Sequence, residues 1–387
     1  MKIFIKYLKH LFVIATLGYF VFKLLHYFEE INPIKKELSD FKFTDIYFGQ
    51  FKDMELDNDI ILVDIGKMGN SKTRKDITDF LNRIDDYNPK VIALDVDFKY
   101  DPNVPKKINQ NLITALNKND VVMYYDLQKE NNVWYKAGSE LDIDASKIKQ
   151  GYSNNLVEKD KFGVLRFFQP FVTQGADTLK HFSIVIAEKF GVKIDQPFKE
   201  NKKVMINFSY KFNDPRDLND TSNLQIFKDK IVIVGLFTKI NGAPLYNEDV
   251  HYTSSNKNYL GKSPPNMYGG EVVATIVSNI KQSSFIKYQK YLSFSLNILF
   301  SLIVYFLLLY MKTYYHQLYG AVEIIIKFVL VMLFILVSIF FISYKNIYID
   351  FTMVGLVSFF AVEFVGLIDS LINFIENKVT KLISLKK

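Results

Sequence analysis

The sequence predicts an α/β extracytoplasmic domain with a mostly parallel sheet, attached to an α-helical membrane domain with one N-terminal and three C-terminal transmembrane helices. Three observations lead to this fold class. Short apolar runs of strand length alternate with amphipathic helical segments through the middle of the chain, which is the order of elements in parallel α/β sheets. Long runs without charge fill the last quarter of the chain, and another apolar run follows three lysines near the N-terminus. Runs of that length are typical of membrane spans.

The C-terminal spans are the clearest elements of the membrane domain. The first, at residues 291–311, carries no charged side chain. At about 1.5 Å of rise per residue, such a helix crosses a hydrocarbon core of roughly 30 Å. Two further runs complete an up-down-up bundle. The spans are predicted at residues 291–311, 328–344 and 351–374, with short connections at 312–321 and 345–350.

The apolar run at residues 11–28 is predicted to be an uncleaved anchor, because no small-x-small cleavage site follows it. Lysines flank the spans on both sides, and their small excess beside the termini favours cytoplasmic termini and an external polar domain. The absence of cysteine is compatible with an oxidising exterior. The predicted domains are a cytoplasmic tip with its anchor (1–28), the extracytoplasmic domain (29–290), the membrane bundle (291–374) and a basic cytoplasmic tail (375–387).

The positive charge of the chain does not indicate nucleic-acid binding. The formal net charge is +7, but lysines beside the membrane spans account for much of the excess. A nucleic-acid surface usually gathers Lys and Arg on one face, and the sequence contains no arginine cluster. We therefore expect no nucleic-acid partner.

After a lead-in at residues 29–58, the extracytoplasmic domain begins with a strand–helix–strand unit. Residues 59–66 and 88–98 have the apolar composition of strands buried on both faces. Residues 73–87, between them, place apolar side chains at helical spacing. The two strands are therefore expected to be parallel. The remaining elements are predicted as a helix at 104–117, strands at 120–127 and 164–168, a helix at 178–191, strands at 204–210 and 227–237, and a helix at 268–282.

Carboxylates follow the first two strands. Asp64 closes the first strand, and Asp95 and Asp97 close the second. Ligands of open parallel sheets collect outside the carboxyl ends of the strands, so these carboxylates are expected at one edge. Asp95 and Asp97 point to the same side of an extended backbone. Asp249, one loop after the strand at 227–237, is expected to extend this acidic edge.

Three interpretations of the acidic edge remain open, and we favour them in the order given. The carboxylates anchor the fold, by capping helices or by pairing with an arginine such as Arg166. Alternatively, they bind a hard cation such as Ca²⁺ or an amine ligand. In the third interpretation they take part in catalysis. The candidate ligand-binding residues are Asp64, Asp95, Asp97, Asp249 and Arg166.

Few residues are available to support catalysis. His181 and His251 are the only histidines of the extracytoplasmic domain, and the chain has no cysteine. It has no His pair at metal spacing and no nucleophile-elbow motif. The loop "GLFTKINGAPLYNED" lacks both a GxGxxG pattern and a P-loop lysine. We therefore predict no enzymatic activity, no metal site and no cofactor.

Ionisable residues in the membrane domain are candidates for coupling. Glu363 lies inside the third C-terminal span, where a carboxylate is costly unless it is protonated, paired or hydrated. Three roles remain open for Glu363, namely pairing with Lys327, contact with another subunit or partner, and ion conduction. Asp369 lies on a different face of the same helix, together with small residues typical of a helix seam. The candidate coupling residues are Glu363, Asp369 and Lys327.

Six segments in order resemble the extracellular sensor family known as the CHASE type-two domain. They are "ILVDIG", "NPKVIALDVDF", "DKFGVLRFFQPF", "HFSIVIAEKFG", "KDKIVIVGLF" and "PPNMYGGEVVATIVSNI", the last immediately before the membrane spans. The resemblance implies a bacterial periplasmic or extracellular input module, usually followed in the cytoplasm by a kinase or cyclase. After Phe374 only a short tail remains, so we expect a stand-alone membrane protein that signals through a partner.

The resemblance implies a multi-pass sensor of the bacterial cytoplasmic (inner) membrane. We expect its external domain to detect an envelope signal or ligand and the membrane bundle to transmit it to a membrane or cytoplasmic signalling protein. The helix near Gly270 to Ser284 precedes the bundle directly and is the expected lever. The alternative is a non-enzymatic scaffold subunit of a cell-envelope complex. A homo-oligomer is a further option for the partner.

Overall fold

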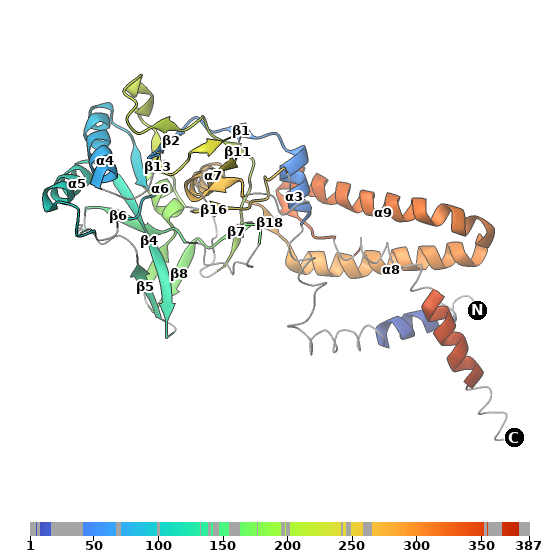
Figure 1. Cartoon of the computed structure of the whole chain (residues 1–387). Coiled ribbons are helices and arrows are strands. Elements are labelled where there is room, and N and C mark those ends of the chain that lie inside the picture. The colour runs from blue at the N-terminus through green and yellow to red at the C-terminus, as the bar shows by residue number, and fades with distance from the viewer. Residues whose placement is uncertain are drawn as a thin grey trace. The chain divides into compact units, whose positions relative to one another are not determined.

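The chain forms two compact units, which Figure 1 draws together. The α/β unit comprises Asp45–Lys287, and the helical unit comprises Met1–Thr44 and Tyr288–Lys387. The computed structural model describes residues 5, 8–16, 42–66, 71–98, 101–131, 133–137, 141, 147–154, 163–175, 177–194, 198, 202–240, 243–244, 249–257, 265–351, 354 and 366–378. The predicted domain boundaries stay a prediction.

A seven-stranded sheet is the centre of the α/β unit. Its order is β12-β2-β13-β3-β4-β5, and β6 also pairs with β4. All of its pairs are parallel except β4–β5. The prediction of an α/β domain with a mostly parallel sheet is therefore confirmed. The central strands are β2 (Ile60–Asp64), β13 (Ile231–Gly235), β3 (Val91–Leu94) and β4 (Val121–Glu130).

Strand β13 lies between the two strands that the sequence joins by a helix. β2 and β3 both run parallel to β13, but they do not pair with each other. All five residues of β13 are buried. A strand this apolar is best accommodated with sheet on both sides and helices on both faces, which is the central position.

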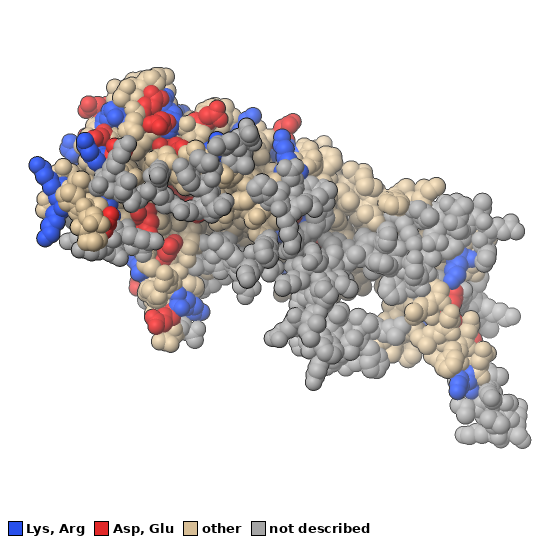
Figure 2. Space-filling view, viewed as in Figure 1, with Lys and Arg blue, Asp and Glu red and all other residues tan. Residues whose placement is uncertain are grey.

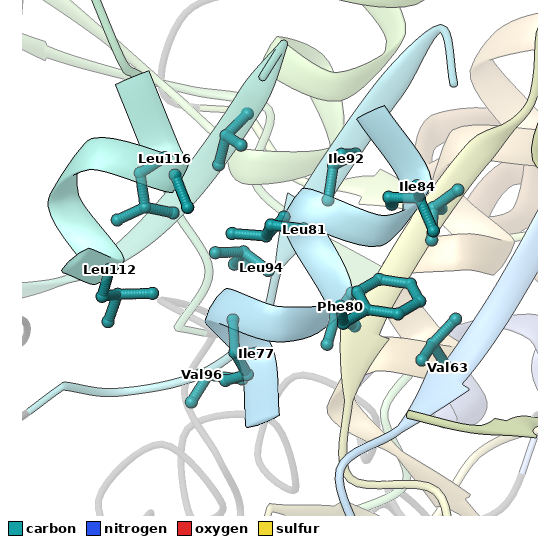
Figure 3. Packing of buried hydrophobic residues seen from close by; sticks show 14 of the residues in the cluster. Val63, Ile77, Phe80, Leu81, Ile84, Ile92, Leu94, Val96, Leu112 and Leu116 are labelled. Carbon is teal, nitrogen blue, oxygen red and sulfur yellow. The ribbon is translucent and has the colours of Figure 1, made fainter. Parts of the chain in front are cut away.

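Helices cover both faces of the sheet because alternate strand residues point to opposite sides. One apolar cluster packs α4 (Ser71–Ile84) and α5 (Lys106–Lys118) against residues such as Ile92 and Leu94 (Figure 3). The other packs α6 (Phe182–Phe190) and α7 (Gly269–Gln282) against the intervening residues, such as Val91 and Ala93. The site described below lies where α6 and α7 begin.

Short elements complete the unit, and the first and last of them cross its boundaries with the helical unit. They are α3 (Phe43–Ile46), a π-helical turn at Tyr47–Phe51, β1 (Glu55–Leu56), a 3-10 turn at Asp85–Tyr87, β5 (Val133–Ala137), β6 (Lys149–Tyr152), β7 (Phe167–Phe168), β8 (Phe171–Gln174), β9 (Asp177–Lys180), β10 (Val204–Met205), β11 (Tyr210–Lys211), β12 (Arg216–Asp217), a 3-10 turn at Leu224–Phe227, β14 (Lys239–Ile240), β15 (Ala243–Pro244), β16 (Val250–His251), β17 (Met267–Tyr268) and β18 (Lys287–Tyr288).

The helical unit contains α8 (Lys290–Tyr314), α9 (His316–Lys345) and β19 (Ile347–Tyr348). Within the described residues, two stretches, Lys290–Tyr314 and Phe328–Lys345, are long and apolar enough to cross a membrane. The predicted loop at 312–321 is wrong, because α9 already begins at His316. Polar side chains are compatible with a helix outside the apolar core of a bilayer, so the turn shortens to Tyr315.

Two predicted spans are described only in part. Residues 8–16 and 366–378 are helical, whereas most of the anchor at 11–28 and of the span at 351–374 lies outside the described residues. Glu363 also lies outside them, and the side chain of Lys327 is not described. The number of spans and the roles of these two residues stay predictions.

Candidate functional site

An acidic cavity of about 620 Å³ opens in the α/β unit, beyond the carboxyl end of β3 and beside the middle of β4. Four carboxylates line it, those of Asp95, Asp97, Asp126 and Asp249. Its other walls include Tyr124, three aliphatic residues of α7, Leu165, and residues 167–169. Figure 2 shows acidic and basic side chains interspersed over the visible face of this unit, but no Lys or Arg is among the described residues that line the cavity.

The end of β3 places Asp95 at the centre of this site. The backbone N–H of Asp95 donates to the carbonyl oxygen of Val234 at 2.8 Å, which fixes it beside β13. Glycines provide room for the side chain. A Cβ on Gly270 would lie 3.1 Å from Asp95 Oδ2 and 2.8 Å from the ring of Phe237. The absence of a side chain at the start of α7 therefore lets the carboxylate approach the helix.

Burial and neighbouring charge act together on Asp95. Burial is the larger cause, and the carboxylates of Asp249 and Asp126 add repulsion, so the pKa of Asp95 is raised well above its ordinary value. The same surroundings raise the pKa of the Tyr124 hydroxyl, chiefly through burial. The cavity thus holds more negative charge than its environment stabilises.

His181 contributes a neutral donor to the cavity wall. It is the N-cap of α6, and its Nδ1 accepts a hydrogen bond from the backbone N–H of Ser183 at 3.2 Å. The proton of the neutral ring is therefore on Nε2. Burial lowers the pKa of His181 to about 3, so the imidazole is uncharged at neutral pH. The rings of Tyr152 and Phe168 pack edge-on against it.

Three of the predicted site residues share this cavity, namely Asp95, Asp97 and Asp249. Sequence reasoning missed Asp126, although alternation along β4 places it on the same side as Tyr124. His181 was assigned to an apolar helix, whereas it caps that helix and lines the cavity. A His immediately before an apolar helical run is the signal that was available. Ligand binding by these residues stays a prediction.

Asp64 lies elsewhere and joins two strand ends. Its carboxylate accepts hydrogen bonds from the backbone N–H groups of Gly66 and Phe237, both at 3.0 Å, and from the Thr238 hydroxyl at 2.5 Å. It therefore ties the end of β2 to the loop that follows β13. These contacts correspond to the structural interpretation of a strand-end aspartate, and Asp64 is not among the residues that line the cavity.

Arg166 pairs with a carboxylate that does not line the cavity. Its guanidinium forms a two-pronged pair with Asp45, with Nε to Oδ1 at 2.9 Å and Nη2 to Oδ2 at 2.5 Å. The Ser254 hydroxyl donates to the same carboxylate at 2.7 Å. Both partners of the pair are buried. Arg166 therefore joins the first residues of the α/β unit to segments more than a hundred positions away.

No group of three or more His, Asp or Glu side chains that could hold a metal ion occurs in the described part of the chain. Asp249 marks the exposed side, since 48% of its side chain is accessible, and His251 Nε2 lies 3.5 Å from its Oδ1.

A second polar cluster lies in the helical unit. Asp369, one of the predicted coupling residues, pairs with His10 Nε2 at 3.1 Å and with Lys312 Nζ at 3.3 Å. Nδ1 of the fully buried His10 lies 2.7 Å from the Tyr305 hydroxyl. The cluster links the helical stretches at 8–16 and 366–378 to α8.

Replacing Asp95 by Asn is expected to stabilise the protein above neutral pH. A carboxyl whose pKa is raised by folding contributes stability at low pH and loses it as the pH rises through the folded-state pKa. Asn removes that loss, so the free energy of unfolding should exceed that of the wild type at pH 8 by on the order of 1–3 kcal/mol. Unfolding of the full chain in detergent, followed by the fluorescence of Trp134, measures the difference.

The pH dependence distinguishes this effect from a stabilisation that is independent of the charge on Asp95. The gain from Asp95→Asn should vanish near pH 4, where the wild-type carboxyl is also neutral. The exposed Asp177 of β9 supplies the matched control, because Asp177→Asn changes the same charge outside the cavity. A gain that is equal at both pH values would contradict the argument.

Comparison with known protein families gives one match. The family model described as the CHASE2 domain matches residues 17–311, which is more than half of the chain. Comparisons with curated proteins and with solved structures gave no match. The matched region contains the whole α/β unit and most of α8.

Proposed function

The chain belongs to the CHASE2 domain family, a family of type-two extracellular sensor domains, and from this we propose that it is a membrane sensor that receives its signal in the acidic cavity. In this proposal the cavity binds the signal without catalysing a reaction. The helical unit passes the resulting conformational change to a membrane or cytoplasmic signalling partner. The observation that carries the proposal is a sensor-family domain with a partly exposed cavity lined by carboxylates.

Membrane attachment is supported by two apolar helices that follow the α/β unit in the sequence, and by the match to an extracellular domain family. We place the chain as a multi-pass protein of the bacterial cytoplasmic membrane, with the α/β unit outside. The apolar stretches of α8 and α9 would then lie in the bilayer. The predicted anchor and third C-terminal span would complete the bundle.

Helix α7 is the proposed route for the signal. Its first turns line the cavity through Gly269, Val272 and Val273. Most of the helix is buried, so a shift at the cavity end would be carried along it as a rigid element. Only residues 283–289 separate the end of α7 from the start of α8.

The far end of α7 is held firmly by an asparagine pair. The backbone N–H of Asn207 donates to Asn279 Oδ1 at 2.7 Å, and Asn279 Nδ2 donates to the carbonyl oxygen of Asn207 at 2.8 Å. This pairing ties the helix to the segment after β10. Displacement of α7 would therefore move that segment and the connection to α8 together.

The Asp369 cluster is proposed to hold the helical unit in the arrangement that the partner recognises. Replacing Asp369 with Asn removes its charge from His10 and Lys312. We expect the resistance of the unit to unfolding in SDS to fall by about 1 kcal/mol, which is typical of polar contacts between membrane helices. Ser370→Ala is the control, because that hydroxyl donates within its own helix turn, to the carbonyl oxygen of Gly366. Equal resistance of the wild type and Asp369→Asn would contradict a packing role.

The rival function is a non-enzymatic scaffold in an envelope complex, and copurification separates the two. The full chain would be isolated from its native membrane as wild type, Asp249→Asn and the control Asp177→Asn. A sensor predicts that the recovery or activity of the copurifying partner changes in Asp249→Asn alone. The same stoichiometric assembly in all three preparations would favour the scaffold and contradict the sensor.

A further inference from the structure

We propose that the acidic cavity binds a small organic ammonium ion that also carries a neutral hydrogen-bond acceptor. This inference rests on the proposed sensor function and names the chemical class of the signal. Asp95 and Asp249 would receive the ammonium group, the apolar walls would cover the carbon skeleton, and His181 would donate to the acceptor.

The charge of the cavity selects a cation. Repulsion between Asp95 and Asp249 is among the causes of the altered acidity of Asp95. No donor from the described residues forms a hydrogen bond to the Asp95 carboxylate, so an incoming N–H group would meet an available acceptor. Hydrogen bonds between an ammonium ion and carboxylates are among the stronger ones in proteins.

The size and walls of the cavity select an organic cation over a metal ion. Its volume of about 620 Å³ is within the range of pockets for small molecules. Apolar side chains, including Leu165, Phe167, Ile206 and Ile276, form a large part of the lining. The carboxylates provide no cluster of three metal ligands within the described residues. A carbon skeleton with one charged end matches such a lining.

His181 is the independent observation that points to a ligand. Only 4% of the residue is exposed to solvent, and it lines the cavity. Its Nδ1 is occupied by the Ser183 N–H, so its Nε2 carries the hydrogen. No described residue accepts a hydrogen bond from that Nε2–H. The Nε2 atom itself is not fully buried, so it is accessible from the cavity, and an acceptor on the ligand would bind it.

Binding of this cation should release protons. An ammonium ion beside Asp95 favours its ionised form, so the affinity should rise with pH through the raised pKa of that carboxyl. Calorimetric titration in two buffers of different ionisation enthalpy measures the proton release. The titratable groups that line the cavity around Asp95 are Asp97, Tyr124, Asp126, His181, Asp249 and His251.

The test uses the full chain in lipid nanodiscs and three probes, with pentylamine as a fourth for the variants described below. The first, 5-aminopentan-1-ol, has an ammonium group, an apolar skeleton and a hydroxyl. Pentane-1,5-diol replaces the ammonium group with a second hydroxyl, and calcium chloride supplies a metal ion alone. Saturation-transfer NMR and calorimetry should detect the amine and should give at least tenfold weaker binding of the diol and of Ca²⁺.

Two variants test which residue binds each end of the ligand, Asp249 for the ammonium group and His181 for the neutral acceptor. Asp249→Asn should weaken 5-aminopentan-1-ol by about tenfold, whereas Asp177→Asn should leave its affinity unchanged. His181→Asn retains a side-chain oxygen that can cap α6 but lacks the Nε2–H donor. In the wild type, 5-aminopentan-1-ol should bind about two- to tenfold more tightly than pentylamine, and this ratio should approach one in His181→Asn.

The outcomes separate this inference from the sensor function. Equal binding of amine and diol, tighter binding of Ca²⁺, or no detectable binding of the amine would overturn the ammonium assignment. The partner response in Asp249→Asn would still test the sensor by itself. Conversely, tight binding of the amine without any effect on the partner would retain the site and contradict the sensor.

Discussion

Replacing Arg166 with Ala is expected to lower the free energy of unfolding of the α/β unit by about 3–5 kcal/mol. The pair with Asp45 is buried on both sides. Removing the guanidinium therefore takes the counter-charge from a carboxylate that cannot move into water. Chemical unfolding of the full chain in detergent, followed by Trp134, measures the loss, because the single tryptophan of the chain lies on β5 of this unit.

An exposed ion pair provides the matched control. Lys180 and Glu188 lie 2.8 Å apart with 42% and 36% of their side chains exposed. Lys180→Ala should cost less than about 1 kcal/mol, since solvent screens such pairs. The double variant Asp45→Ala/Arg166→Ala should cost less than the sum of the single changes. A cost of Arg166→Ala no larger than that of Lys180→Ala would contradict the structural role assigned to the pair.

A disulfide between residues 205 and 286 is expected to abolish transmission from the cavity to the helical unit. Met205 and Ile286 oppose each other in an antiparallel bridge, with the N–H of Ile286 donating to the carbonyl oxygen of Met205 at 3.3 Å. Opposed residues of such bridges are close enough for a disulfide. Met205→Cys/Ile286→Cys would therefore fix the segment after α7 to β10, in a chain with no other cysteine.

For the readout, Asp249→Asn is introduced into the protein that carries the Met205→Cys/Ile286→Cys pair. The change that Asp249→Asn causes in the amide hydrogen exchange of α8 is then measured. This response should be absent after oxidation and should return on reduction. Thr173→Cys/Thr178→Cys is the matched control, because these residues face each other across the β8–β9 hairpin, away from the connection. A full response in the oxidised 205–286 form would show that the signal does not pass through this segment.

Local sequence patterns account for most of the α/β unit. The apolar runs at 59–66 and 88–98 predict β2 and β3, and helical spacing predicts α4, because periodicity reports which face an element buries. The same logic places Asp95 and Asp97 beyond a strand end and therefore at the ligand edge of a parallel sheet.

Long-range pairing explains what the sequence did not predict. Arg166 could pair with any of several carboxylates, and its partner Asp45 lies 121 positions away. The insertion of β13 between β2 and β3 likewise depends on a strand far along the chain. Periodicity identifies buried faces, whereas the choice of neighbour depends on how all elements pack together. Among the cavity residues that the sequence analysis missed, Asp126 could have been found by alternation, because its strand was predicted.

The most direct test of the sensor proposal is amide hydrogen exchange in α8 of the full chain in lipid nanodiscs. The wild type would be compared with Asp249→Asn, which imitates the charge neutralisation expected from a bound cation, and with Asp177→Asn. We predict a change of about fivefold or more in the exchange rates of α8 for Asp249→Asn alone, as typical coupling energies imply. A change confined to the α/β unit, with α8 exchanging at the wild-type rate, would contradict transmission from the cavity to the membrane.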